Sequence, residues 1–269
     1  MAVKVSHFLI RRLTRSCTSI KSVKGRPLSY PLKQYVEVVC YVVLNGIKWS
    51  VLEDIRWAKC HYSAYYRFFQ KMCNADVFEA AHRDFMKGRR LDKSQFFIDT
   101  TNVRNKRGSN CLGRLGRNVK DKSINGNKLS TICDNKGVTV SWCLAPANEA
   151  DVSLVRNTLP DKSMNGRTIV GDKGYISSEL QKYLEKHRGV RYVYPYRKNQ
   201  QKAKENNQRL QRILKKRGVV ERSYSWIKDS ERVELRYERL ALYYLGRVSF
   251  VILNTNYGKV HGRTELHIE

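Results

Sequence analysis

Apolar residues in the first third of the chain recur at helical spacing. One stripe follows Pro31, which suits a first helical turn, and a second stripe runs through residues 62–73. Residues 27–90 are therefore expected to form a small all-helical domain. Arg67 and Lys71 lie off the second stripe, so two of these helices resemble a DNA-binding helix-turn-helix. A compact helical bundle that binds no DNA would show the same stripes, and both interpretations stay open.

Strand-like runs replace the helical pattern after Gly88-Arg89-Arg90, and helical stretches are interspersed with the later ones. The predicted strands are Gln95–Val103, Lys128–Cys133, Val138–Leu144, Thr168–Gly171 and Tyr192–Tyr196. The predicted helices are Asp151–Leu159, Ser177–His187, about Asn207–Val233, and Leu240–Tyr257, which is apolar on most sides and should be buried. Three strands with a hairpin turn, followed by alternating helices and strands, predict an α/β domain over 91–260.

The composition adds a partner to this outline. The net charge is +28, with 52 Lys and Arg against 24 Asp and Glu, which indicates a polyanionic partner such as DNA or RNA. No apolar run reaches the ~18 residues of a membrane span, so we expect no membrane association. The basic segment 1–26 lacks the apolar core of a secretory signal, so we expect that the protein is not secreted. This segment is either an arm that lies on nucleic acid or a solvated tail.

Three acidic residues stand out in this basic chain. Asp99 follows the apolar run Phe96–Ile98, Asp172 follows Ile169-Val170, and Glu221 begins a helical pattern. Each acid alone is more typical of a turn, a cap or a solvated surface. Together, two strand ends and one helix deliver the oxygen ligands that a pair of Mg²⁺ ions needs against a phosphodiester. An RNA-binding or ribosomal protein would explain the charge but not these acids.

Basic residues surround the three acids. Residues 197–228 hold eleven Lys and Arg against only two acids, and helical spacing places Arg217, Glu221 and Lys228 on one edge. A second basic segment, Arg104–Lys122, is expected to be a loop that grips DNA or is simply solvated. Trp226 is expected in the core.

These residues resemble the DDE transposases of bacterial insertion sequences. The matching blocks are Phe97–Val103, Ile169–Tyr175 and Arg217–Lys228, with Gly126-x-Lys128 and Ala147-Asn148-x-x-Asp151 between the first two. In the third block Arg217, Glu221 and Lys228 match the family pattern, but Leu214 stands where the family has Tyr.

The resemblance implies an RNase H-like mixed sheet with flanking helices, preceded by the helical domain. It implies a transposase that binds element-end and target double-stranded DNA, as a homodimer, and that cuts and joins strands. Asp99, Asp172 and Glu221 would be the catalytic residues and the ligands of two Mg²⁺ ions, with Mn²⁺ as a substitute. The residues expected to contact DNA are Lys128, Arg217, Lys228, Arg67, Lys71, Arg104, Arg114, Arg117, Lys173 and Arg222.

Two alternatives remain at this point. The protein could be a transposase descendant that binds DNA without cutting it, or a metal-dependent nuclease that cuts without joining. The scattered cysteines indicate reduced thiols. The expected location is the bacterial cytoplasm with the nucleoid, or a nucleus or viral factory in another host.

Overall fold

Two compact units form this computed structural model, which describes residues 2–3, 5, 7–18, 20, 27–87, 95–115, 124–160, 164–195, 208–261 and 266–267. One unit comprises Met1–Arg89, Arg107–Asn110 and Ile227–Glu269, and the other comprises Arg90–Lys106 and Cys111–Trp226. The units meet at Arg89 and Arg90, next to the expected division at 90. No division falls at 26 or 260, because residues 1–26 and the C-terminal residues group with the N-terminal helices.

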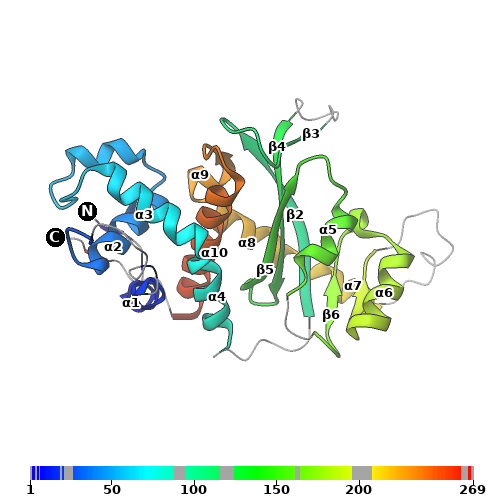
Figure 1. Cartoon of the computed structure of the whole chain (residues 1–269). Coiled ribbons are helices and arrows are strands. Elements are labelled where there is room, and N and C mark those ends of the chain that lie inside the picture. The colour runs from blue at the N-terminus through cyan, green and yellow to red at the C-terminus, as the bar shows by residue number, and fades with distance from the viewer. Residues whose placement is uncertain are drawn as a thin grey trace. The chain divides into compact units, whose positions relative to one another are not determined.

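The first unit is helical (Figure 1). Its longer helices are α1 (His7–Ser16), α2 (Leu32–Leu44), α3 (Tyr62–Asn74), α4 (Val77–Lys87) and α10 (Ala241–His261). Its shorter elements are η2 (Trp49–Asp54), α9 (Glu231–Glu234), and the strands β1 (Ala2–Val3), β8 (Leu235–Arg236) and β9 (Leu266–His267), of which β1 and β9 pair. The predicted burial of the last helix is confirmed, because α10 packs against α2, α3 and α4 and is buried over most of its length.

The basic segment at the N-terminus is in part a folded helix. Within the expected arm of residues 1–26, α1 buries Leu9, Ile10 and Leu13. Their spacing forms one apolar stripe, which leaves the basic residues of the helix on its other sides. The interpretation as a solvated tail is therefore wrong for residues 7–16, and a contact of their basic side chains with nucleic acid stays a prediction.

A buried ion pair lies in the core of the first unit. The guanidinium of Arg247 on α10 is fully buried, and its Nε lies 2.6 Å from Oε1 of Glu238. Its Nη1 also donates a hydrogen bond of 2.9 Å to the carbonyl oxygen of Val43 at the end of α2. A charge in an apolar helix is tolerated here because both an acid and a backbone acceptor compensate it.

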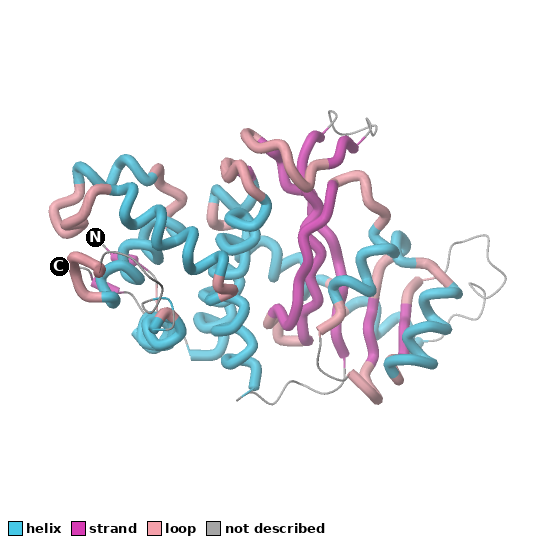
Figure 2. Tube along the Cα trace, in the orientation of Figure 1, coloured by secondary structure: helices cyan, strands magenta, loops and turns pink. Residues whose placement is uncertain are grey.

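A mixed β-sheet forms the centre of the second unit, which confirms the predicted fold class (Figure 2). The strands are β2 (Gln95–Asn105), β3 (Gly113–Leu115), β4 (Ile124–Asp134), β5 (Thr139–Pro146), β6 (Thr168–Val170) and β7 (Arg191–Val193). On one side of β2 lies the antiparallel β4, which pairs in turn with β3 and β5; on the other side lie the parallel strands β6 and β7. Central position explains why Phe96–Ile98 of β2 are all buried.

Helices cover both faces of this sheet. They are α5 (Asp151–Thr158), α6 (Ser178–Arg188), α7 (Gln208–Lys215) and α8 (Gly218–Lys228). In Figure 1, α5 lies in front of the sheet and α8 behind it. The predicted single helix over Asn207–Val233 is wrong: turns at residues 216–217 and 229–230 divide it into α7, α8 and α9. Gly218 follows the first turn, and glycine is a weak helix former that tolerates such a break.

Among the described residues, no helix combines the length and the apolar character that crossing a membrane requires.

Arg247→Met is expected to lower the free energy of unfolding by about 3–5 kcal/mol, because it leaves the Glu238 carboxylate buried without its partner. Urea denaturation would measure this loss. The matched control is Lys33→Met, which breaks a pair with Glu37 in which the lysine side chain is 62% exposed. That change should cost about 0–1 kcal/mol. Equal losses for the two variants would contradict a stabilising role for the buried pair.

Candidate active site

The edge of the sheet where β6 ends brings two of the predicted acids to the same place. The parallel pairing of β2 with β6 ends at Phe97 and Val170. Asp99 and Asp172 each lie two residues beyond that last pair. Because β2 and β6 run parallel, both acids lie at the same level along the sheet. Asp172 follows the end of β6 as predicted, but Asp99 lies within β2, which continues to Asn105, so the predicted strand end is wrong for Asp99.

Asp99 is half-buried and is contacted by the segment that includes the start of α8. Nη2 of Arg217 lies 3.5 Å from Oδ2 of Asp99, and the arginine and aspartate side chains are 21% and 20% exposed. The hydroxyl of Tyr224 on α8 donates hydrogen bonds to the carbonyl oxygens of Asp99 (2.5 Å) and Leu129 (3.1 Å). The helix is thereby fixed against β2 and β4 beside the acid.

Glu221 lies on α8 between these two contacts. It is four residues after Arg217 and three before Tyr224, which is the spacing of neighbours on one side of a helix. Its side chain is exposed. Within the described part of the chain, no three His, Cys, Asp or Glu side chains are grouped closely enough to hold a metal ion. The shared metal site of Asp99, Asp172 and Glu221 therefore stays a prediction.

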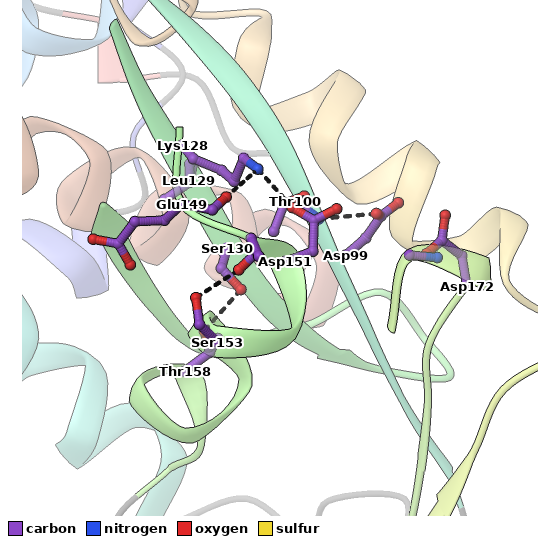
Figure 3. A network of polar contacts seen from close by, with 12 residues as sticks. Asp99, Thr100, Lys128, Leu129, Ser130, Glu149, Asp151, Ser153, Thr158 and Asp172 are labelled. Atoms are coloured by element: carbon purple, nitrogen blue, oxygen red, sulfur yellow. Dashed lines mark hydrogen bonds and ion pairs between the residues drawn. The ribbon is translucent and has the colours of Figure 1, made fainter. Parts of the chain in front are cut away.

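Asp172 shapes the turn that follows β6. It is the N-cap of the short helix η3 (Lys173–Tyr175), and its Oδ1 accepts a 2.7 Å hydrogen bond from the amide of Gly174. Lys173 and Gly174 are exposed. Figure 3 shows Asp172 at the side of the site next to Asp99.

The electrostatics of Asp99 indicate a crowded acidic site. Burial raises the pKa of Asp99 to about 6; the Thr100 amide and Arg217 oppose this rise, and the charges of Asp172 and Asp151 add to it. A carboxylate is costly where water is excluded and other carboxylates are near. A bound cation at this position would favour the ionised form.

Lys128 has internal partners instead of an open position. Its side chain is buried, and Nζ donates hydrogen bonds to the carbonyl oxygen of Glu149 (2.6 Å) and to Oδ1 of Asp151 (2.8 Å) (Figure 3). The same Oδ1 accepts a 2.9 Å hydrogen bond from the hydroxyl of Thr100. As placed, Lys128 has its ammonium in an ion pair inside the protein, which is at odds with the predicted phosphate contact.

The other predicted DNA contacts are distributed over both units. Arg67 and Lys71 are exposed one turn apart on α3 of the first unit. Arg222 on α8 is exposed, and Lys228, the last residue of that helix, is half-buried. Arg104 is exposed but lies in β2, so the predicted loop from residue 104 is wrong at its start because the β2–β4 ladder extends to Arg104 and Gly126. The side chain of Arg114 in β3 and all of Arg117 lie outside the described residues.

Three further residues differ from the sequence-based expectation. Trp226 is 37% exposed and not in the core. The buried residues of α8 are Val219, Val220, Ser223, Tyr224 and Ile227, and Trp226 lies on another side of the helix. Tyr224 and Asp151 were not predicted as site residues. Helical spacing from Arg217 and Glu221 is the signal that could have identified Tyr224. The Ala147-Asn148-x-x-Asp151 motif is the signal that could have identified Asp151.

Comparison with known proteins identifies the family. The family model of the transposase DDE domain matches residues 90–242 of the sequence, and the chain belongs to this family. A relative from Burkholderia cepacia, named as a transposase for insertion sequence element IS402, is 28% identical over 138 residues, which is 48% of this chain and 61% of the relative. The chain thus spans about three fifths of that relative.

A solved structure supports the fold. The piggyBac transposase, solved in a synaptic complex with hairpin DNA, superposes with a TM-score of 0.56 at 11% sequence identity. The superposition covers 96% of this chain and 74% of the piggyBac chain. At this identity the likeness concerns the fold alone. The family predicted from the sequence motifs and the RNase H-like fold are both confirmed.

Asp99→Asn is expected to stabilise the metal-free protein at pH 8 and not at pH 4. The pKa of Asp99 lies above its ordinary value of 3.8, at about 6, so the folded state binds this proton more tightly than the unfolded state. That contribution to stability is present below pH ~4 and is lost as the pH rises through about 6. The gain at pH 8 should be roughly 1–3 kcal/mol, measured by denaturation in EDTA.

Asp84→Asn is the control of opposite sign. The hydrogen bond from Lys87 holds the pKa of the Asp84 carboxyl below its usual range. This contribution is present at neutral pH and is lost on acidification, so Asp84→Asn should slightly destabilise the protein at pH 8. A pH-independent effect of Asp99→Asn would contradict the buried, raised-pKa carboxyl.

Proposed function

We propose that this protein is an active DDE transposase that binds transposon-end DNA, cleaves it and joins the ends to target DNA. The observation that carries the proposal is the arrangement at the end of β6. Asp99 and Asp172 share this edge of the sheet, and Arg217 contacts Asp99 from the segment that leads into Glu221. A structural role for Asp99 alone would not require a buried carboxylate beside other acids.

The donor set fits magnesium. Asp99, Asp172 and Glu221 supply hard carboxylate oxygens, the ligands that Mg²⁺ prefers, and Mn²⁺ accepts the same donors. We infer that these three residues would hold two divalent ions, which requires the Glu221 side chain to turn toward the strand ends. When bound, such ions polarise the phosphodiester and favour ionisation of the attacking hydroxyl.

The protein's own groups would position the DNA for this chemistry. Arg217 points its guanidinium at the acidic site, and its buried Nε makes no hydrogen bond to any described residue. An arginine with unused donors beside the acids suits a phosphate oxygen. Exposed Lys173 and Arg222 lie next in sequence to Asp172 and Glu221 and would contact flanking phosphates. These residues bind and orient, and the hydrolytic and joining steps need no covalent protein intermediate.

The partners follow from this proposal. The charge of +28 indicates a polyanionic partner, and double-stranded DNA at element ends and targets is the partner that the family suggests. Cutting two ends favours a homodimer on DNA. We expect the protein to act where the DNA is, in the cytoplasm of a bacterial host.

Asp99→Asn, Asp172→Asn and Glu221→Gln are each expected to abolish cleavage of element-end DNA in Mg²⁺ and to leave DNA binding largely intact. Each change removes a metal ligand but keeps the size of the side chain. Nicked and joined products resolved on denaturing gels would measure the effect. The control is Glu179→Gln, an exposed acid on α6 paired with Arg156, which should retain cleavage.

The same assay separates the alternatives. Wild-type protein that binds DNA and makes no cut would indicate an inactive descendant. Cuts without joined products would indicate a nuclease. Cleavage close to wild type in any of the three acid variants would remove that residue from the site.

Arg67→Gln and Lys71→Gln are each expected to weaken DNA binding at all sequences and to reduce the slope of log K against log salt by about 1. Each change removes one exposed charge from α3 that is proposed to meet a phosphate. Fluorescence anisotropy over a salt series would measure the slope. Lys33→Gln, which removes an exposed charge on α2, is the control. If the salt slopes of Arg67→Gln and Lys71→Gln equal the slope of Lys33→Gln, α3 does not contact DNA.

A further inference from the structure

The geometry points to Asp151, with Lys128 as its counter-ion, as a positioning residue that ties together the two segments carrying Asp99 and Asp172. This inference rests on the proposed function for its catalytic consequence. It gives Lys128 a role inside the site in place of the predicted contact with DNA.

One carboxylate lies close to both acid-bearing segments. Oδ1 of Asp151 accepts the hydrogen bond of Thr100, the residue that follows Asp99 in β2. Oδ2 of Asp151 lies 3.2 Å from the position that a Cβ on Gly174 would occupy, and Oδ1 of Asp172 lies 3.0 Å from the same position. Asp151 is therefore next to the turn that Asp172 shapes, and it is hydrogen-bonded to the neighbour of Asp99.

Lys128 makes this arrangement possible. A third ionised carboxylate beside Asp99 and Asp172 would repel both of them. The ammonium of Lys128 neutralises Asp151 at 2.8 Å, and the carbonyl of Glu149 holds the ammonium from another direction. The pair thus supplies a rigid oxygen between the two segments without adding net charge.

Position in the fold also favours this role over a surface function. Asp151 is the first residue of α5, and Lys128 lies on β4, the strand that pairs with β2. The Asp151 carboxylate of α5 is therefore hydrogen-bonded to β2 and β4 and lies next to η3, and Figure 3 shows it beside Asp99. Residues that hydrogen-bond to metal ligands and orient them commonly lower the metal affinity when they are removed.

Two double variants separate the tie from the charge pair. Lys128→Met/Asp151→Ala removes the ion pair and the oxygen that binds Thr100. Lys128→Met/Asp151→Asn removes the charges but keeps an oxygen and nearly the same shape. Both are neutral, so neither leaves a buried charge unpaired, which a single substitution would do. Ser153→Ala, which deletes a local hydrogen bond to Ala150 on the same helix, is the control.

The first measurement is hydrogen exchange of the metal-free protein. The alanine variant should exchange faster in both residues 96–103 and residues 170–176, and the asparagine variant should exchange as the wild type does. Unchanged exchange in the alanine variant, or a change in one segment only, would overturn the tie. This measurement needs neither metal nor DNA. It therefore tests the role of Asp151 independently of the proposed function.

The second measurement is Mn²⁺ affinity by electron paramagnetic resonance. The alanine variant should bind Mn²⁺ about 10–100-fold more weakly than wild type, and the asparagine variant should recover most of that loss. Wild-type affinity in the alanine variant would refute positioning. Equal loss in both variants would assign the effect to the removed charges and not to the positioned oxygen, and would also refute it. If the wild type binds no Mn²⁺, the proposed metal chemistry is rejected. The hydrogen-exchange result then decides whether Asp151 positions the two segments.

Discussion

Burial of the Asp99 carboxylate beside other acids, near the end of β6, is the constraint on which the site depends. Asp99, Asp151 and Asp172 lie near one another, and the pKa of Asp99 is raised by burial and by the other two. Each acid has a compensating contact: Arg217 for Asp99, Lys128 for Asp151, and the Gly174 amide for Asp172. These contacts offset part of the repulsion, and a bound divalent cation would offset much of what remains.

The backbone gives this arrangement its rigidity. A central strand with neighbours on both sides cannot shift without breaking two ladders, so β2 holds Asp99 in a fixed place. Tyr224 attaches α8 to two strands at once by donating to carbonyls of β2 and β4. Glu221 is thereby carried to the neighbourhood of the site by its helix, although its side chain is exposed.

Charge inside the protein and charge on its surface serve different ends. Arg247 and Lys128 are buried, and each contacts an internal acid and a backbone carbonyl. In contrast, the side chains of Arg67, Lys71 and Arg222 are exposed to solvent. They account for part of the excess of 28 positive charges. Counting basic residues in the sequence therefore overestimates the number available to a nucleic acid.

The sequence alone determined the family, the mixed α/β fold, and the buried apolar runs that Asp99 and Asp172 follow, because apolar runs followed by acids are local patterns. It also predicted the burial of α10 from its apolar character on most sides. It did not determine that residues 227–261 group with the N-terminal helices, or that the segment 207–233 breaks into three helices. Those outcomes depend on packing between distant segments. The pairing of Lys128 with Asp151 was likewise decided by tertiary structure, since residues 23 positions apart meet only when α5 packs on β4.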